Sequence, residues 1–187
     1  MRAPAIVTAL VALTSAARAD RSTVLTLGVN LDARSYANET QQDPNWNGGL
    51  RATLAFEDAP LALPPPGLMD VETHLVPELL AGFISNDARA EGFVGAGLRA
   101  EIQLARNQSE LRRFRFGFYA AARAKITGEH QDAGGEFVIG DYILLGPSGA
   151  TRIGWEGGLG VIKRPDLRAE ESPELEALIT IYAGWKL

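Results

Sequence analysis

Apolar and polar residues alternate one by one along most of this chain, a pattern that predicts β-strands with two different faces. The alternation is clearest in residues 111–126, where aromatic residues and alanines face one way and mainly basic residues face the other. Eight segments carry the pattern, and the sequence predicts a strand for each: residues 22–34, 48–57, 69–83, 92–105, 111–126, 137–146, 150–163 and 175–187. The phase of 137–146 is ambiguous, because both of its faces can be apolar.

The predicted connections alternate in length along the chain. Long polar stretches follow the odd-numbered strands, at 35–47, 84–91, 127–136 and 164–174. Short turns, at 107–110 and 146–149, follow even-numbered strands, and the proline-rich stretch 58–68 is the exception. Pro77 interrupts the third predicted strand, which requires a bulge or a missing ladder bond. The sequence therefore predicts an all-β, up-and-down antiparallel sheet with long loops at one end and short turns at the other.

The N-terminus has the organisation of a secretory signal peptide. Met1 and Arg2 give a short positive region, residues 6–13 are apolar, and residues 17–19 (Ala-Arg-Ala) offer a small-x-small cleavage site. The apolar run is much shorter than the ~20 residues that a membrane-spanning helix needs. We predict a signal peptide over 1–19 and a single domain over 20–187.

The last predicted strand, Leu175 to Leu187, alternates strictly at its odd positions and carries Trp185 two residues before the end. This strand resembles the closing strand of small eight-stranded bacterial outer-membrane β-barrels, the outer-membrane protein A/X/W-like family. In that family the last residue is usually Phe or Trp, whereas here it is Leu187. The resemblance implies a transmembrane barrel in the outer membrane of a Gram-negative bacterium. It also implies contact with outer-membrane lipid and lipopolysaccharide, recognition of the C-terminal strand by the barrel-assembly machinery, and a surface partner for the loops.

Which face points inward must be decided separately, because a soluble lipocalin-like carrier also has eight strands but keeps its apolar face inside. The polar faces combine charges of both signs with many glycines, which suits a narrow interior better than a solvent-exposed surface. The opposite faces carry small alanines and, near the strand ends, the aromatic residues Phe56, Phe83, Phe114, Trp155 and Trp185. This distribution predicts a membrane barrel with aromatic girdles.

The predicted interior is strongly charged. Its basic residues are Arg51, Arg99, Arg113, Arg115, Arg123, Lys125 and Arg152, and its acidic residues are Glu57, Glu72, Glu78, Glu101, Glu156 and Glu176. Buried charges persist only when they are paired and hydrogen-bonded, so we expect salt bridges that largely plug the lumen. The alternative is a narrow, porin-like gated ion path through the same network.

Composition and motifs leave little room for catalysis or cofactors. The chain has no cysteine, and without the predicted signal it carries 16 basic and 23 acidic residues, a net charge of −7 that is a poor match for nucleic acid. Lipid A deacylases of similar architecture carry a His-x-Ser pair, but neither His74 nor His130 is followed by such a serine. A solvated loop explains His130 better than a cation site does, and the glycine-rich run 154–160 lacks the Lys-Ser/Thr ending of a phosphate loop.

The sequence thus predicts no catalytic, binding or metal site and no cofactor. The predicted function is a non-enzymatic outer-membrane role in envelope integrity, adhesion or interaction through four surface loops. Two alternatives remain open: an outer-leaflet lipid-modifying hydrolase of the lipid A deacylase type, and a periplasmic lipocalin-like carrier of a small ligand.

Overall fold

The computed structural model describes residues 23–36, 45–57, 61–62, 71–85, 90–104, 114–128, 132–146, 149–163 and 174–187. They form one sheet of β1 (Thr23–Tyr36), β2 (Asn45–Phe56), β3 (Leu61–Ala62), β4 (Val71–Ser85), β5 (Ala90–Leu104), β6 (Phe114–Thr127), β7 (Asp132–Leu145), β8 (Thr151–Lys163) and β9 (Glu174–Lys186). Within this part of the chain no helix is long and apolar enough to cross a bilayer. The predicted signal peptide lies outside the described residues.

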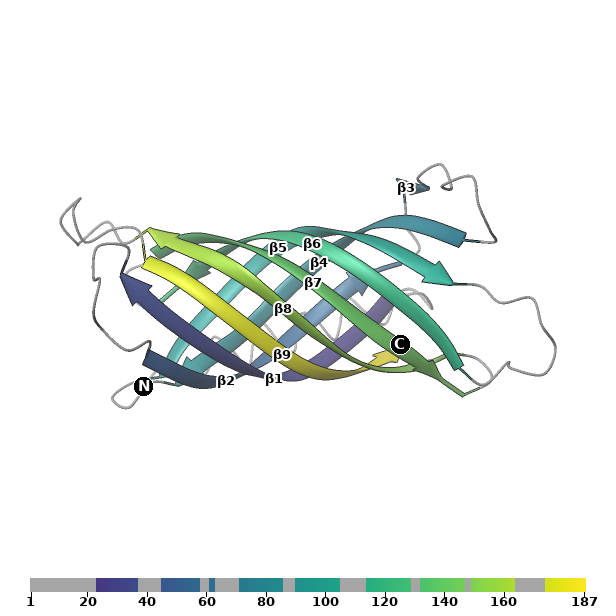
Figure 1. Ribbon diagram of the computed structural model, residues 1–187, viewed down its shortest axis with the longest axis horizontal. Coiled ribbons are helices and arrows are strands. Elements are labelled where there is room, and N and C mark those ends of the chain that lie inside the picture. Colours follow the sequence, from purple (N-terminus) through teal and green to yellow (C-terminus); the bar gives the residue numbers. More distant parts are fainter. Residues whose placement is uncertain are drawn as a thin grey trace.

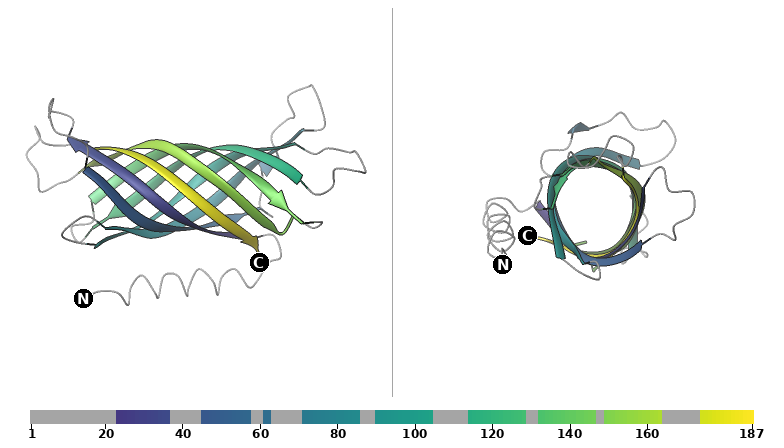
Figure 2. Two further views of the ribbon diagram at one scale, coloured as in Figure 1. Left: turned by 60° about the horizontal axis from the view of Figure 1, so that its bottom comes forward. Right: turned by 90° about the vertical axis from the view of Figure 1, so that its left-hand side faces the viewer.

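The eight long strands close into a barrel, and every neighbouring pair is antiparallel (Figure 1). Strands that follow one another in the chain are neighbours in the sheet, β1 pairs with β9, and the two-residue β3 only flanks β4. The view along the barrel shows a closed ring of strands (Figure 2). The predicted eight-stranded antiparallel up-and-down barrel is therefore confirmed.

The first and last strands meet at one end of the barrel, where the backbone N–H of Leu187 donates a hydrogen bond to the carbonyl oxygen of Thr23 over 2.8 Å. We call this the terminal end and the opposite one the far end. At the far end the strands are joined by residues 37–44, 86–89, 128–131 and 164–173. At the terminal end they are joined by residues 57–70, 105–113 and 146–150.

The predicted contrast between long loops at one end and short turns at the other is wrong, because both ends have short and long connections. The largest error is at β7, which begins at Asp132 instead of residue 137. Gly134 and Gly135 have the composition of a turn, but they stay in the ladder opposite Lys125 and Ala124 of β6. Pairing with a long neighbour therefore overrides the local preference of two glycines for a turn.

Side chains alternate between the two surfaces of the barrel as predicted. Leu27, Val29 and Leu31 of β1 are about half exposed on the outside, while Asn30 and Asp32 are fully buried inside. The ambiguous sixth predicted strand, now β7, is apolar on both sides: Phe137, Ile139 and Ile143 point outward, and Val138, Tyr142 and Leu144 point inward. The exterior is thus predominantly apolar and the interior largely polar, the reverse of a soluble barrel.

Pro77 lies where the β4 ladder is interrupted. Pairing of β4 with β2 ends at Glu78, and pairing with β3 begins at Leu75. Pro77 is paired only with Leu98 of β5. A residue without an N–H fits at a position that lacks a ladder on one side, so the second of the two predicted explanations holds.

Candidate functional site in the barrel interior

Two arginines and two glutamates from four strands form the centre of the interior. The Nη1 atom of Arg51 lies 2.7 Å from Glu136 Oε1 and 2.9 Å from Glu156 Oε1. The Nη1 atom of Arg123 lies 3.1 Å and 2.8 Å from the same two oxygens. All four side chains are at most 5% exposed. Each carboxylate is therefore shared by two cations, an arrangement that compensates burial of the charges.

Further side chains extend this central network. Arg123 Nε donates to Glu78 Oε1 over 2.5 Å, and Arg123 Nη2 contacts Glu156 Oε2 at 2.8 Å, so Arg123 contacts three carboxylates. Lys125 Nζ lies 3.1 Å from Glu136 Oε2 and also contacts Glu176. The hydroxyl of Tyr119 donates to Glu156 Oε2 over 2.9 Å. The network consequently joins β2, β4, β6, β7, β8 and β9 across the interior.

A second cluster of charges lies closer to the terminal end. Arg99 Nη2 is 2.7 Å from Glu101 Oε2 and 3.7 Å from Glu57 Oε1. Arg152 Nη2 contacts Glu57 Oε1 at 2.5 Å, and Tyr142 donates its hydroxyl hydrogen to Glu101. Two separate groups of paired charges therefore fill the interior along the barrel axis.

Tyrosine rings occupy the space that interior glycines leave. A Cβ atom added to Gly117 would lie 2.1 Å from Cζ of Tyr142, and one added to Gly140 would lie 2.6 Å from Cζ of Tyr119. The guanidinium of Arg152 stacks 4.6 Å from the centre of the Tyr142 ring. The sequence predicted that small residues make room for charged side chains. They also make room for the aromatic rings on which those charges stack.

Gly117→Ala is expected to destabilise the barrel by about 1–3 kcal/mol, because the new methyl group forces the Tyr142 ring from its contacts with Glu101 and Arg152. Urea titration of the protein refolded into lipid vesicles measures the free energy of unfolding. Gly135→Ala is the matched control: it is another strand glycine, but its Cβ would meet only the Arg123 carbonyl oxygen at 3.5 Å. Equal stabilities of the two variants would contradict this role of Gly117.

A small void separates the two groups of charges. Its volume is about 10 Å³, and its lining includes Arg51 and Arg123 of the central network, Arg99 of the second cluster, and the hydroxyl-bearing Thr26 and Thr180. A void of this size holds about one water molecule. This void has no room for a small organic ligand.

Most of the charges predicted for the interior are there, but their arrangement adds residues that the sequence prediction lacked. Ten of them are confirmed inside: Arg51, Arg99, Arg123, Lys125, Arg152, Glu57, Glu78, Glu101, Glu156 and Glu176. Arg113 and the side chains of Arg115 and Glu72 lie outside the described part of the structure. Glu136, which contacts three cations, was missed because the sixth strand was predicted to start one residue later.

Of the two histidines, the structure describes one, His74. His74 is half-buried on the inward-facing register of β4, opposite Glu101 of β5, and Leu75 and Val76 follow it. His130 lies outside the described residues. Among the side chains that the structure describes, no group of three or more His, Cys, Asp or Glu residues is placed to hold a metal ion. Acyl transfer needs a nucleophile beside an oriented base, and His74 has no neighbouring serine in the chain.

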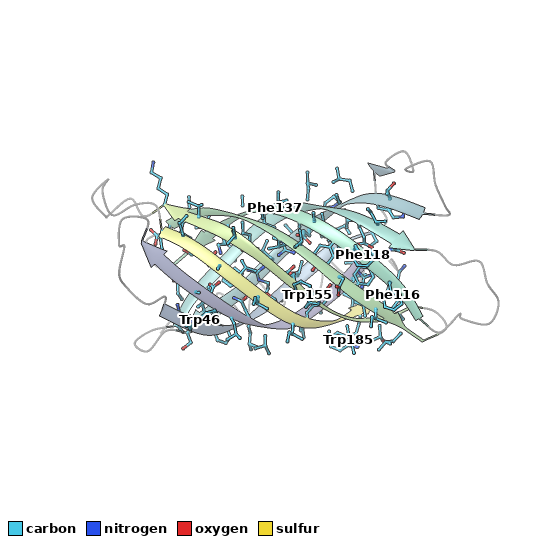
Figure 3. The ribbon with its side chains drawn as sticks, in the orientation of Figure 1. Trp46, Phe116, Phe118, Phe137, Trp155 and Trp185 are labelled. Carbon is cyan, nitrogen blue, oxygen red and sulfur yellow. The ribbon has the colours of Figure 1, made fainter. Side chains whose placement is uncertain are left out.

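Most of the exposed aromatic side chains of the described strands lie toward the ends of the barrel. Phe116, Phe118 and Trp185 lie toward the terminal end and Trp46 lies at the far end, whereas Trp155 and Phe137 lie closer to the middle (Figure 3). Trp185 was predicted at this position, whereas Trp155 was predicted nearer a strand end, Phe56 and Phe83 are only partly exposed and the side chain of Phe114 is not described. The distribution is typical of the interfacial girdles of membrane barrels.

Solved structures of three small outer-membrane proteins are similar to this chain. Neisserial surface protein A is 8% identical, and the match covers 88% of this chain and 97% of that chain with a TM-score of 0.49. The outer membrane enzyme PagL is 8% identical, with 86% of this chain and 99% of that chain covered and a TM-score of 0.50. Ail, the attachment invasion locus protein of Yersinia pestis, is 10% identical, with 89% of this chain and 99% of that chain covered and a TM-score of 0.42. No protein-family model and no characterised protein sequence matches the chain. At such identities the similarity shows the fold alone, and the match to PagL, at a TM-score of 0.50, is the one of the three that carries it: an eight-stranded β-barrel.

Proposed function

We propose that this chain is a non-enzymatic outer-membrane barrel with a closed lumen, which serves envelope integrity, adhesion or interaction. The observation that supports a closed lumen is the pair of ionic groups inside, which leave a void of only about 10 Å³ between them. An eight-stranded barrel is just wide enough for its own side chains to fill. Function is then left to the lipid-facing exterior and to the four connections at the far end.

The closed lumen predicts that the wild-type protein passes no steady ion current in a planar lipid bilayer. As a comparison, Arg51→Ser combined with Glu136→Ser removes one cation and one anion that lie 2.7 Å apart, so the interior widens without a change in its net charge. This variant is expected to pass more current than the wild type. Steady current through the wild type would contradict the closed lumen and favour the gated ion path.

A lipid-modifying hydrolase is the competing function. The observation that favours it is the similarity in fold to PagL, which is described as an outer membrane enzyme. The fold is shared, but His74 points toward the interior of this barrel and lies apart from the lipid-facing surface. A hydrolase acting on outer-leaflet lipid needs its nucleophile and base where that lipid can reach them. A mass change in lipid A when this chain is expressed would favour the hydrolase.

The lipocalin-like carrier is opposed by the distribution of polarity. A carrier of that kind holds its ligand among inward-facing apolar side chains, whereas the inward-facing side chains here include eleven charged residues in ion pairs. We retain, as parts of the proposal, contact of the exterior with outer-membrane lipid and lipopolysaccharide, and recognition of β9 by the barrel-assembly machinery. A surface partner would bind the connections at the far end.

A further inference from the structure

A single acidic side chain interrupts the apolar exterior between the two rims. Asp141 of β7 lies on the outward-facing register, between Ile139 and Ile143, and is half-buried. Among the described strands, the other charged residue on this register is Lys163, at the last position of β8 on the far rim. Asp141 is therefore the one carboxylate that the described exterior presents to the surrounding membrane.

Two aromatic rings flank Asp141 on the neighbouring strands. The β-ladder pairs Asp141 with Phe118 of β6 on one side and with Trp155 of β8 on the other. The two rings are 48% and 44% exposed; Phe118 lies in the half of the barrel nearer the terminal end, and Trp155 lies close to the middle (Figure 3). Directly opposite residues in an antiparallel ladder have Cβ atoms about 5 Å apart, so the carboxylate and both rings can contact the same ligand.

The described part of the barrel supplies no cation for this carboxylate. None of the described residues forms a hydrogen bond or ion pair with the Asp141 side chain, and the Tyr182 hydroxyl reaches only the Asp141 backbone oxygen, at 3.4 Å. A carboxylate in an apolar surrounding is costly unless it is paired. Among the components around the described strands, the membrane is the source of a partner that would offset this cost.

The depth of Asp141 indicates what can reach it. β7 ends at Leu145, four residues beyond Asp141. At ~3.4 Å per residue and a tilt of ~40°, Asp141 lies about 10 Å along the axis from that end, compared with about 18 Å for the middle of the strand. Asp141 therefore lies about 8 Å from the middle of the strand, in the outer part of an apolar band ~25 Å tall and about 4 Å from its edge. A lipid headgroup reaches the carboxylate by moving inward over this short distance, beside aromatic rings that favour the membrane–water interface.

We propose that Asp141, Phe118 and Trp155 form a binding site for the primary ammonium group of a phosphatidylethanolamine molecule in the leaflet at the terminal end. The carboxylate accepts charge-assisted hydrogen bonds from the ammonium, and the rings attract the same cation through their faces. A quaternary choline headgroup has no N–H to donate, and an anionic glycerol headgroup is repelled. The proposal rests on the membrane-facing exterior and is independent of whether the lumen is closed.

Native mass spectrometry of the detergent-purified barrel tests the site. The protein is mixed with equal amounts of phosphatidylethanolamine, phosphatidylcholine and phosphatidylglycerol of identical acyl chains, and the bound lipids are counted. We expect the wild type to retain phosphatidylethanolamine about tenfold over either competitor, the ratio that one charge-assisted hydrogen bond provides. Asp141→Asn should lower the ratio to about one, and Asp141→Glu should preserve it. Trp155→Leu should lower the amount of phosphatidylethanolamine retained several-fold, because one of the two ring faces that attract its ammonium is lost.

A relocated carboxylate is the matched control. Ala183 also faces outward near the terminal end, but its paired neighbours are Leu27 and Ile153 and neither is aromatic. Asp141→Asn combined with Ala183→Asp should not restore the preference. No preference in the wild type, an unchanged preference in Asp141→Asn, unchanged retention of phosphatidylethanolamine in Trp155→Leu, or full restoration by Ala183→Asp would overturn the proposal. Carbodiimide coupling of Asp141 to a lysine of another protein, without bound phosphatidylethanolamine, would assign the carboxylate to a protein contact and overturn it as well.

Discussion

Arg123→Gln is expected to lower the free energy of unfolding by about 3–5 kcal/mol, the range found when one partner of a buried ion pair is removed. Arg123 contacts Glu78, Glu136 and Glu156, and its side chain is 2% exposed. Glutamine is also polar, but it carries no positive charge and its side chain is too short to contact three carboxylates. The measurement is a urea titration of the protein refolded into lipid vesicles, followed by tryptophan fluorescence.

Two variants control for this effect. Combining Arg123→Gln with Glu156→Gln removes a cation and an anion together, and the pair should cost less than the sum of the two single changes. Lys163→Gln removes a cation from the exposed far rim and should change stability by no more than about 0.5 kcal/mol. If Arg123→Gln were as stable as Lys163→Gln, the central network would not stabilise the barrel.

Ala122→Arg is expected to cost about 2–4 kcal/mol, the value for a cation on the lipid face near the bilayer midplane. Ala122 lies near the middle of β6, exposed on the outside between Leu98 of β5 and Phe137 of β7. No anion lies at these paired positions, so the guanidinium would have no partner. Refolding into vesicles at increasing urea concentration measures the effect.

Ala122→Gln is the control for side-chain length and polarity, and it should cost less because it places no charge in the hydrocarbon region. Arginine at this position would be harmless if the outward face met water. A wild-type stability of Ala122→Arg would therefore contradict the membrane-facing assignment of the exterior, and with it the location in the outer membrane.

The sequence predicts the fold and the inside of the barrel well because period-two alternation reports directly on which face each residue occupies. Arg51 and Glu156 were assigned to the interior on this basis and are buried there. The alternation does not report partners across the lumen. Arg51 on β2 contacts Glu136 on β7, although three long strands lie between β2 and β7 on either side of the barrel. Such pairs depend on side-chain length and barrel radius, which no local pattern encodes.

The errors of the sequence-based prediction concentrate on β7, where two features obscure the alternation of apolar and polar residues. Gly134 and Gly135 indicated a turn, so Glu136 was left out of the predicted interior. Apolar residues on both faces of the strand then concealed its phase, so Asp141 was not recognised as an outward-facing charge. When the predicted strand is extended to include Glu136, the charge of this residue identifies the inward face. That face carries Glu136, Val138, Gly140 and Tyr142.

The central network also constrains the order in which the barrel assembles. Arg51 contacts Glu136 and Glu156, which follow it by 85 and 105 residues in the chain. These contacts cannot form until most of the strands have been added and the sheet has curved enough to bring β2 opposite β7 and β8, and long-range contacts of this kind slow folding. In a sheet in which only some of the strands have paired, these charged side chains would lack their partners and would lie next to lipid. Insertion into the membrane and closure of the barrel are therefore expected to occur together, late in folding, with the ion pairs forming only in chains that have closed.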